Sequence, residues 1–489
     1  MPPIAFPTLN FAALAPELAV LGTAAVVMIC DLFIKDKRIL GYLSLLGLAV
    51  AIVPCLMLRG VTPTPAFQNM AVSDGFSLVL DLIFIITAAL SVLVALGYLD
   101  NKGMQRGEYY TLLLFATSGM MLMGAATDLI IIFMGLEIMS IGLYILAAFN
   151  RRQLASGEAG MKYFVLGAFA SAFFLYGAAL IYGATGTTNL QAIGAWFTPE
   201  RGNLDDPLAL VGLGLLLVGF GFKVAAVPFQ WWTPDVYHGA PTSVTAFMSV
   251  GAKAAGFAAL TRLLMVSFGN AFTLDWQIAV AGLAFITMTG GNLAALAQKD
   301  VKRMLAYSSI AHAGYILVGV AAGTMDGVSG VLFYLMSYAF MNIGAFAVIT
   351  VLERRDEIGT TLTDYAGLAA RKPLLALAMA LFMFSLTGIP PFIGFWGKLY
   401  VFRAAVEANM SWLAVAGMIN SAISAFYYLG VVVQMYMRPA PTAADGAEII
   451  PLNLSGPITV ALAVTAVVTI VLGLWPTPLV NLISLGLFG

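Results

Sequence analysis

The chain has 489 residues, 61% of them hydrophobic and only 10% charged, and its formal net charge is −1. Soluble domains carry about 25% charged residues, so this composition excludes a water-soluble globular protein, and the near-neutral balance argues against binding to nucleic acid. Two cysteines and two histidines, with no C-x-x-C or H-E-x-x-H spacing, exclude an iron–sulfur cluster, a paired-histidine haem and a zinc-protease site, so we expect no cofactor or metal in this chain.

Runs of about 20 mainly apolar residues, the length that crosses a bilayer core of about 30 Å, follow one another along the whole chain. The first lies near the N-terminus without the basic region or cleavage site of a secretory signal, and we interpret it as a permanent span. The sequence therefore predicts an all-α, multi-pass membrane protein of about fourteen helices. They cover residues 12–34, 39–58, 76–99, 109–126, 128–149, 160–183, 207–230, 241–268, 275–297, 301–322, 327–352, 373–400, 411–437 and 455–486.

The basic residues predict the orientation of these spans, because Lys and Arg accumulate on the cytoplasmic side of a membrane. We expect both termini on the outer (periplasmic) side of a bacterial cytoplasmic membrane. Sixteen basic residues lie on alternate connections of one side: Lys35, Lys37, Arg38, Lys102, Arg106, Arg151, Arg152, Lys162, Lys299, Lys302, Arg303, Arg354, Arg355, Arg371, Lys372 and Arg438. Four lie on the other side: Arg59, Arg201, Arg262 and Arg403.

Five spans are predicted to occur twice. The spans that begin at 109, 128 and 241 recur at 275, 301 and 411, with offsets of 166, 173 and 170. Because five is an odd number, the second copy must run through the membrane in the opposite sense, which is the inverted-repeat plan of many transporters. The expected organisation is an N-terminal three-helix segment (1–108), a first repeat (109–268), a second, inverted repeat (269–437) and a C-terminal helix (438–489).

One helix of each predicted repeat is broken by proline. Pro228 in the first repeat, and Pro390 and Pro391 in the second, each strip a carbonyl four residues earlier of its helical hydrogen bond. Free carbonyls at membrane depth are tolerated where they line protein or water. The breaks therefore predict polar cavities inside both repeats.

Three lysines and one glutamate lie within predicted spans. A charge at the bilayer centre costs roughly 2.5–3.5 kcal/mol, so the presence of each of these four residues requires an explanation. Glu137 lies about 13 Å and Lys253 about 18 Å into their helices, while Lys223 precedes the first break and Lys398 follows the second. They predict a hydrated path for protons or cations in which Glu137 and Lys223 form an ion pair. The alternatives are a static buried pair, or lysines that extend to the interface.

His312 lies within two residues of the position that an offset of 173 gives as the second-repeat counterpart of Glu137. That match favours a role for His312 in relaying protons. The alternative is a structural histidine that hydrogen-bonds a neighbouring carbonyl.

Other ionisable residues are less central. Glu17, Asp31 and Asp81 lie near the ends of their spans, and we predict that they are interfacial or packing residues. Asp235 and His238 follow the first break on the basic side. They favour either a proton entrance or a network that fixes the connection.

Four runs of the sequence resemble the antiporter-like membrane-arm subunits of proton-pumping NADH:quinone oxidoreductase, respiratory complex I. The similarity covers essentially the whole chain. The runs are Met134-Gly-Leu-Glu137, Phe222-Lys-Val-Ala-Ala-Val-Pro-Phe-Gln-Trp-Trp-Thr-Pro-Asp-Val-Tyr-His-Gly-Ala-Pro-Thr242, Lys302-Arg-Met-Leu-Ala-Tyr-Ser-Ser-Ile-Ala-His-Ala-Gly-Tyr315 and Gly388-Ile-Pro-Pro-Phe-Ile-Gly-Phe-Trp-Gly-Lys398.

The resemblance implies fourteen helices, two inverted five-helix repeats and a half-channel in each. It implies that Glu137 and Lys223 are a coupled pair, that Lys253 is the central proton carrier and that Lys398 lies on the outward side; His312 completes the expected proton pathway. It also implies that flavin, iron–sulfur clusters and quinone belong to partner subunits. The expected partners are neighbouring antiporter-like and small membrane subunits of complex I.

Within this family the chain is most similar to subunit N. It stops at Gly489 without the lateral helix expected of subunit L, and it has Lys398 where subunit M typically has glutamate. Cation/proton antiporters and membrane hydrogenases share the same core, so a subunit of such a complex is one alternative. A non-conducting scaffold is another, although four intramembrane charges argue against it, because discarding an idle buried charge is stabilising.

Overall fold

The computed structural model describes residues 9–197, 205–269, 273–353, 359–440, 454–484 and 487. In this part of the chain, twelve helices are long and apolar enough to cross a membrane. Two further passes occupy the remaining predicted spans: α4, and the interrupted pair α15 and α16. The prediction of an all-α membrane protein with about fourteen passes is confirmed. Arg201, Arg354 and Arg355 lie outside the described residues.

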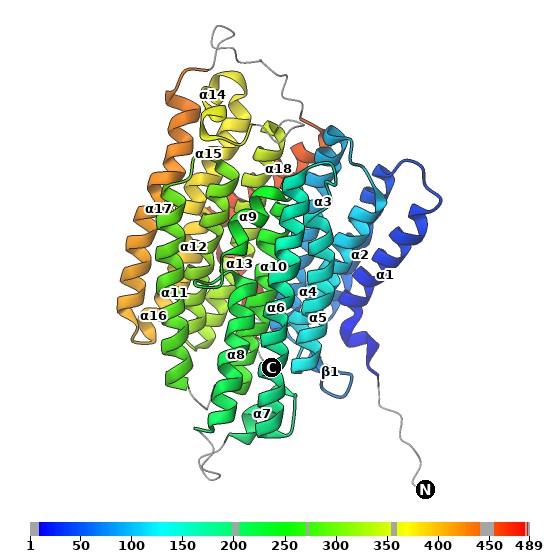
Figure 1. Cartoon of the computed structure of the whole chain (residues 1–489), viewed down its shortest axis with the longest axis vertical. Coiled ribbons are helices and arrows are strands. Elements are labelled where there is room, and N and C mark those ends of the chain that lie inside the picture. Colours follow the sequence, from blue (N-terminus) through cyan, green and yellow to red (C-terminus); the bar gives the residue numbers. More distant parts are fainter. Residues whose placement is uncertain are drawn as a thin grey trace.

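The bundle is built from the following helices, labelled in Figure 1 where there is room. The first are α1 (Ala15–Asp31), α2 (Arg38–Met57), α3 (Gly75–Lys102), α4 (Gly107–Ala125), α5 (Leu129–Ala147), α6 (Leu154–Thr185), α7 (Leu190–Trp196), α8 (Pro207–Val224), α9 (Trp232–Gly239) and α10 (Thr242–Ser267). After them come α11 (Thr273–Leu296), α12 (Val301–Ala321), α13 (Met325–Leu352), α14 (Leu368–Arg371), α15 (Pro373–Thr387), α16 (Ile393–Glu407), α17 (Ser411–Met437), α18 (Gly456–Leu474) and α19 (Thr477–Ile483).

Short elements cover the ends of the bundle. The 3₁₀ turn η1 (Phe11–Leu14) packs on an antiparallel hairpin of β1 (Thr64–Ala66) and β2 (Ala71–Ser73), and η3 (Leu362–Tyr365) precedes α14. The predicted last span, 455–486, is wrong as a single helix. Pro476 and Pro478 interrupt it after Leu474, because proline lacks the N–H that would continue the helix.

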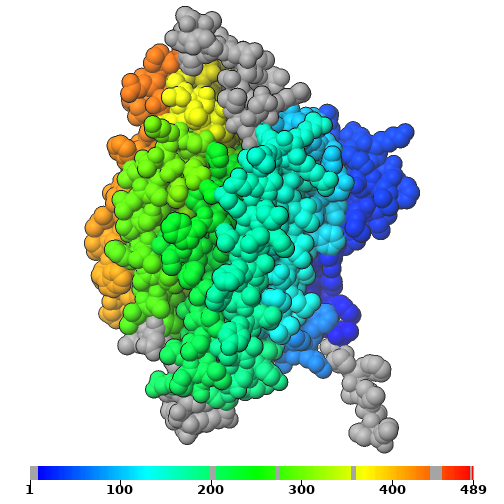
Figure 2. Space-filling model, viewed as in Figure 1, coloured from blue at the N-terminus to red at the C-terminus, as the bar shows by residue number. Residues whose placement is uncertain are grey.

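The core of the bundle is formed by α10 and α13, which are buried along a whole membrane-spanning length. α10 packs against α3, α4, α8 and α13. Small residues allow this close packing: a side chain at Gly256 would meet Val224 of α8, and one at Gly251 would meet Met120 of α4. At the edges, α1 lies on one side and α17 on the other (Figures 1 and 2).

Two matching corners define the inverted repeat. At the start of α5, Asp128 accepts hydrogen bonds from the backbone N–H of Ile130 and, at 2.7 Å, from the hydroxyl of Thr188. At the start of α12, Asp300 accepts in the same way from the N–H of Arg303 and the hydroxyl of Thr360. Backbone bridges accompany both corners, Asp128 with Asn189 and Asp300 with Thr361.

Asp300, Thr360 and Thr361 stand 172 positions after Asp128, Thr188 and Asn189, whereas the N–H donor Arg303 stands 173 positions after Ile130. The first corner adjoins α7, and the second adjoins the segment that leads into α14, at opposite ends of the bundle in Figure 1. The first and last described elements share the end where α3 begins, since the N–H of Phe76 donates to the carbonyl of Leu487 at 3.1 Å. The side of the membrane that this end faces stays a prediction.

Candidate functional site

Lys223 lies in the last turn of α8, directly before the first break. The helix ends at Val224, Ala225 adopts a left-handed conformation with φ +59°, and the Val227–Pro228 peptide is cis. The carbonyl of Phe222 accepts a hydrogen bond from the N–H of Ala225 at 3.1 Å and another from Trp232 Nε1 at 3.0 Å. The predicted break therefore exists, and a side chain from beyond it bonds to the end of α8.

The Lys223 ammonium group is buried between α5, α6 and α8. Its Nζ donates to Ser140 Oγ at 2.7 Å and lies 5.6 Å and 6.0 Å from the ring centroids of Tyr144 and Tyr163. Such cation–π contacts stabilise an ammonium group that is removed from water. With the ring of Phe222 at 5.8 Å, Lys223 thus has one hydroxyl acceptor and three aromatic rings as its immediate surroundings.

The expected ion pair between Glu137 and Lys223 does not form as a direct contact in the described residues. The Glu137 carboxylate instead accepts from Ser171 Oγ of α6 at 2.5 Å, and it remains within electrostatic range of Lys223. The lysine reaches Ser140, one turn beyond Glu137 on α5, because Nζ approaches from the end of α8. Glu137 is also partly exposed on the surface of this chain.

An aromatic group separates Lys223 from the next lysine. Tyr163 stacks on Trp232 of α9 with ring centroids 4.5 Å apart, and Trp232 contacts Tyr237 edge-on at 5.9 Å. The Tyr237 ring centroid lies 5.9 Å from Lys253 Nζ. The short helix that follows the first break therefore places its aromatic rings between the two ammonium groups.

Lys253 lies in the middle of the bundle on α10. Only 2% of the residue is exposed, and its Nζ donates to the carbonyl of Ser309 on α12 at 2.5 Å and also to the Ser309 hydroxyl. Serine thus accepts the hydrogen bond of Lys253 as it does that of Lys223.

His312 lies one turn beyond Ser309 on α12. Its Nδ1 is 2.7 Å from the hydroxyl of Tyr334, and its Nε2 is 2.9 Å from the hydroxyl of Tyr428. Tyr428 also hydrogen-bonds Ser308. Both ring nitrogens therefore have hydroxyl partners, whereas the structural alternative of a backbone carbonyl partner is not realised among the described contacts.

The offset of 172 between the corners at Asp128 and Asp300 gives His312 a different counterpart in the first repeat from the predicted one. With the offset of 172, Glu137 corresponds to Ser309, and Ser140 corresponds to His312. The predicted match of His312 with Glu137 was therefore one helical turn out of place. Ser140 and Ser309 are not at corresponding positions of the two repeats, yet each accepts a hydrogen bond from a buried lysine.

Lys398 lies on α16, after the second break. α15 ends at Thr387, Gly388 adopts φ +91°, and the Pro390–Pro391 peptide is cis. Lys398 Nζ donates to the freed carbonyl of Thr387 at 2.8 Å and to Ser421 Oγ at 2.5 Å. A Cβ at Gly388 would approach the Lys398 side chain to 2.9 Å, so glycine suits this position for its space as well as its φ.

Polar side chains of α11 and α17 continue from Lys398. Its Nζ lies 4.7 Å from the ring centroid of Tyr315, whose hydroxyl accepts from Asn292 Nδ2 at 2.9 Å. Asn292 also accepts from Tyr427 and contacts Asn420. Sequence reasoning missed these residues, because hydroxyl and amide groups are common in spans and only the packing brings them together.

Ion pairs fix the connection that contains Asp235 and His238. Asp235 pairs with Lys162 at 2.9 Å and with Arg303 at 3.0 Å, while His238 Nε2 lies 3.6 Å from Asp300. Burial raises the pKa of Asp235, but the hydrogen bond and charge of Lys162 and the charge of Arg303 outweigh it and leave the pKa below its ordinary value. These contacts favour the network alternative over a proton entrance.

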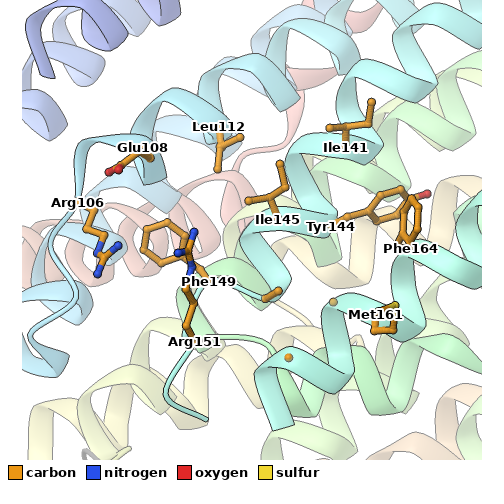
Figure 3. A pocket seen from close by; sticks show the side chains of 13 residues that line it. Arg106, Glu108, Leu112, Ile141, Tyr144, Ile145, Phe149, Arg151, Met161 and Phe164 are labelled. Atoms are coloured by element: carbon orange, nitrogen blue, oxygen red, sulfur yellow. The ribbon is translucent and has the colours of Figure 1, made fainter. Parts of the chain in front are cut away.

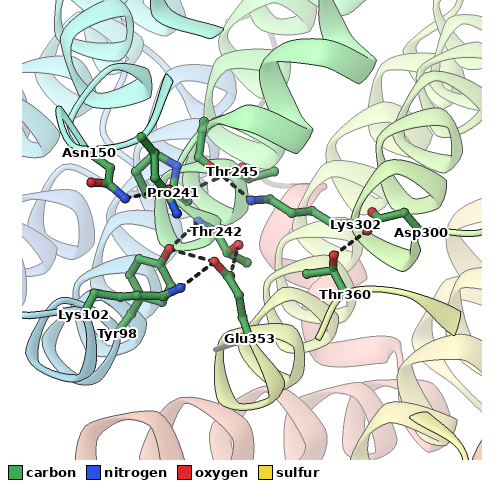
Figure 4. Close-up of polar contacts among 12 residues, drawn as sticks. Tyr98, Lys102, Asn150, Pro241, Thr242, Thr245, Asp300, Lys302, Glu353 and Thr360 are labelled. Carbon is green, nitrogen blue, oxygen red and sulfur yellow. Dashed lines mark hydrogen bonds and ion pairs between the residues drawn. The ribbon is translucent and has the colours of Figure 1, made fainter. Parts of the chain in front are cut away.

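A buried acid–base cluster at the basic end was missed by the sequence analysis. Figure 4 shows Lys102, Tyr98 and Thr242 converging on Glu353, and Lys102 forms a 3.0 Å ion pair with a Glu353 side chain that is fully buried. Burial raises the pKa of Glu353, but the charges of Lys302 and Lys102 outweigh it and leave the pKa below its ordinary value. Glu353 is therefore ionised at neutral pH.

Three basic residues that the sequence analysis assigned to connections are buried. Lys102 and Lys302 lie at the basic end, where Lys302 Nζ donates to the carbonyl of Ala240 at 2.7 Å. Arg262 lies near the end of α10 and pairs with Asp74 at 2.6 Å. The assignment was wrong because the ends of the central helices stay inside the protein, covered by the helices around them.

The acidic residues of the N-terminal helices have different environments. Asp31 pairs with Lys37 at 2.6 Å near the basic end, as an interfacial residue does. Asp81 and Glu17 are packing residues, with 1% and 8% exposure. In the described residues, no three histidine, cysteine or acidic side chains gather as a metal site.

Comparison with known proteins places this geometry in a family. The transmembrane family described as NADH:quinone oxidoreductase/Mrp antiporter matches residues 126–424, which include both breaks and Glu137, Lys223, Lys253, His312 and Lys398. The chain therefore belongs to this family, as its resemblance predicted. A curated relative from Trichlorobacter lovleyi, NADH-quinone oxidoreductase subunit N, is 50% identical over 96% of each chain.

Solved structures show the same fold. A chain of respiratory complex I from Thermus thermophilus is 37% identical, covers 96% of this chain and 100% of its own, and superposes with a TM-score of 0.81. A chain of the Mrp complex from a Dietzia species superposes with a TM-score of 0.80 at 23% identity, covering 96% of this chain and 95% of its own, and shares the fold. The predicted similarity to the subunit N type agrees with the relative from Trichlorobacter lovleyi.

Proposed function

We propose that the chain is a proton-translocating membrane-arm subunit, of the subunit N type, in NADH:quinone oxidoreductase. The observation that carries this proposal is the row of buried lysines Lys223, Lys253 and Lys398. Each donates to a hydroxyl or a carbonyl, and none forms an ion pair within the described residues. A buried ammonium group whose hydrogen-bond acceptors are neutral can hold or release a proton as its neighbours move.

In this proposal protons pass along Glu137, Lys223, Lys253, His312 and Lys398. Residues 109–268 and 269–437 each supply a half-channel, between the N-terminal segment 1–108 and the C-terminal helix 438–489. The hydroxyl groups that contact each of these residues support their membership of the path, because hydroxyls both donate and accept protons in hydrogen-bonded chains.

The chain itself carries no redox chemistry in this proposal. Flavin, iron–sulfur clusters and quinone belong to partner subunits, and quinone reduction there supplies the energy. Neighbouring antiporter-like and small membrane subunits of complex I are the partners. The partly exposed Glu137 supports a partner subunit against α5 at the level of this carboxylate, because lipid tails cannot solvate it. Both termini face the periplasm from a bacterial cytoplasmic membrane.

The test is proton pumping by the intact complex in vesicles. With Lys223→Ala we expect NADH oxidation to remain measurable while pumping per NADH falls strongly, and Arg403→Ala, which removes an exposed charge, is the matched control. Unchanged pumping in Lys223→Ala would remove Lys223 from the path. Full pumping in the Lys223→Ala, Lys253→Ala double variant would support a scaffold, and NADH-independent, cation-dependent proton exchange would support an antiporter.

A further inference from the structure

A pocket of about 510 Å³ opens between α4, α5 and α6. Arg106 and Glu108, at the start of α4, and Arg151, in the connection between α5 and α6, line one part of it. Figure 3 shows these three charged side chains near one another, with Ile141, Tyr144 and Phe164 on the other side of the view. The pocket therefore has a charged part and an apolar part, and no residue of the proposed proton path lines it.

The charged part is arranged for an anion. Arg106 and Arg151 are exposed, and in the described part of the chain neither forms an ion pair, with Glu108 or with any other carboxylate. Guanidinium groups bind phosphate through paired, charge-assisted hydrogen bonds. Both arginines also belong to connections of the basic side, where anionic headgroups are recognised by basic pockets between helices.

The apolar part distinguishes a lipid from a free anion. The wall carries aliphatic and aromatic side chains from three helices: Leu112, Ile141, Ile145, Phe149, Met161 and Phe164. A free phosphate would leave this wall unused, whereas an acyl chain attached to the phosphate would cover it. We propose that this pocket binds one anionic phospholipid, with its phosphate on Arg106 and Arg151 and the start of an acyl chain on the apolar wall.

The pocket places the lipid next to the candidate site, because the two share the side chain of Tyr144. Tyr144 lines the pocket, and its ring lies 5.6 Å from Lys223 Nζ and packs edge-on against Tyr163 at 4.8 Å. An acyl chain on the apolar wall therefore touches the outer surface of a ring that surrounds the Lys223 ammonium group. The lipid supports the Tyr144 ring and takes no part in proton transfer.

The proposal is tested with the intact complex in vesicles that contain a photoactivatable phosphatidylglycerol, or the matching phosphatidylcholine at equal density. We expect cross-links from phosphatidylglycerol to the peptide 141–164, and a loss of at least about tenfold in the Arg106→Ala, Arg151→Ala double variant, because two charge-assisted contacts are removed. Arg152→Ala is the matched control, since Arg152 is the adjacent exposed arginine and does not line the pocket.

A steric variant keeps both arginines. A Cβ at Gly157, which lines the pocket, would meet no atom within 4 Å, so Gly157→Phe is expected to fold and to remove the cross-link; Gly214→Phe on α8, equally open, is its control and should leave it unchanged. Three outcomes would overturn the proposal. They are equal labelling by phosphatidylcholine, displacement of the label by inorganic phosphate, and cross-linking of this pocket to a neighbouring subunit in place of lipid.

Discussion

Arg262 is buried like Lys223, Lys253 and Lys398, and the side chain of Lys102 is only 5% exposed, yet these two groups of basic residues have different partners. Arg262 holds Asp74 with two hydrogen bonds, at 2.6 Å and 2.9 Å, and Lys102 holds Glu353 at 3.0 Å. The three lysines donate to serine hydroxyls and backbone carbonyls instead.

The difference teaches that burial alone does not identify a conducting charge. A cation paired with a carboxylate keeps its proton and holds helices together, and it is costly to remove. A lysine with neutral acceptors can lose its proton without leaving a buried anion behind. Substitutions of the paired cations are expected to reduce assembly of the complex, and substitutions of the lysines with neutral acceptors are expected to reduce proton pumping.

Replacing Arg262 is expected to have the largest effect on stability. Arg262→Ala leaves Asp74 as a buried carboxylate without its cation, a change that typically costs about 3–5 kcal/mol. We expect little assembled complex, measured as the yield of this chain in native gels, while the complex that does assemble pumps normally per NADH. Normal yield with reduced pumping would move Arg262 into the conducting group.

Replacing Lys253 is expected to reduce proton pumping and leave assembly intact, the opposite of replacing Arg262. Methionine has a similar length and fits an apolar interior, so Lys253→Met is expected to assemble and to lower proton pumping per NADH at least about tenfold. Pumping is measured in vesicles with a pH-sensitive dye, with NADH oxidation recorded in parallel. Poor assembly together with normal pumping in the surviving fraction would place Lys253 with the structural charges.

Glu137→Gln tests the acidic member of the path. The amide keeps a hydrogen-bond acceptor for Ser171 but removes the charge that Lys223 senses, so we expect pumping to fall by about three- to tenfold with assembly intact. The measurement is the same dye assay. A lower yield with unchanged pumping per turnover would show that Glu137 is structural.

Asp235→Asn is expected to have the smallest effect. Its pairs with Lys162 and Arg303 are partly exposed, and such pairs contribute about 0.2–1 kcal/mol each. Because its folded pKa lies below the ordinary 3.8, this contribution is present at neutral pH and is lost only as the pH falls below that value. The melting-temperature difference from wild type should therefore stay constant between about pH 8 and pH 5; growth of the difference across that range would contradict the assignment.

The spans and breaks could be predicted because their signals are local. Apolar length marks a span wherever it occurs, and Pro228, Pro390 and Pro391 each remove a helical hydrogen bond whatever surrounds them, which favours a break. The intramembrane charges were found for the same reason.

The environments of the charges could not be predicted. Lys102 and Arg262 stand at the ends of spans, where a basic residue normally meets water, and only the packing of α3 and α10 shows that they are enclosed. Ser140 and Ser309 are ordinary residues in sequence, and their role depends on which lysine reaches them. The offset of 173 placed the counterpart of Glu137 at 310, and only the acceptance of a position within two residues matched Glu137 with His312.

The two corners at Asp128 and Asp300 allow the orientation of the chain in the membrane to be measured by comparing one corner with the other. They share the same contacts but lie at opposite ends of the bundle, so a reagent that cannot cross the membrane meets them from opposite sides. A single cysteine at the partly exposed Asn189 or at the exposed Thr361, in a chain without Cys30 and Cys55, would be modified from one compartment only. The two reactivities, compared in sealed vesicles of known orientation, would assign the periplasmic end without any added tag.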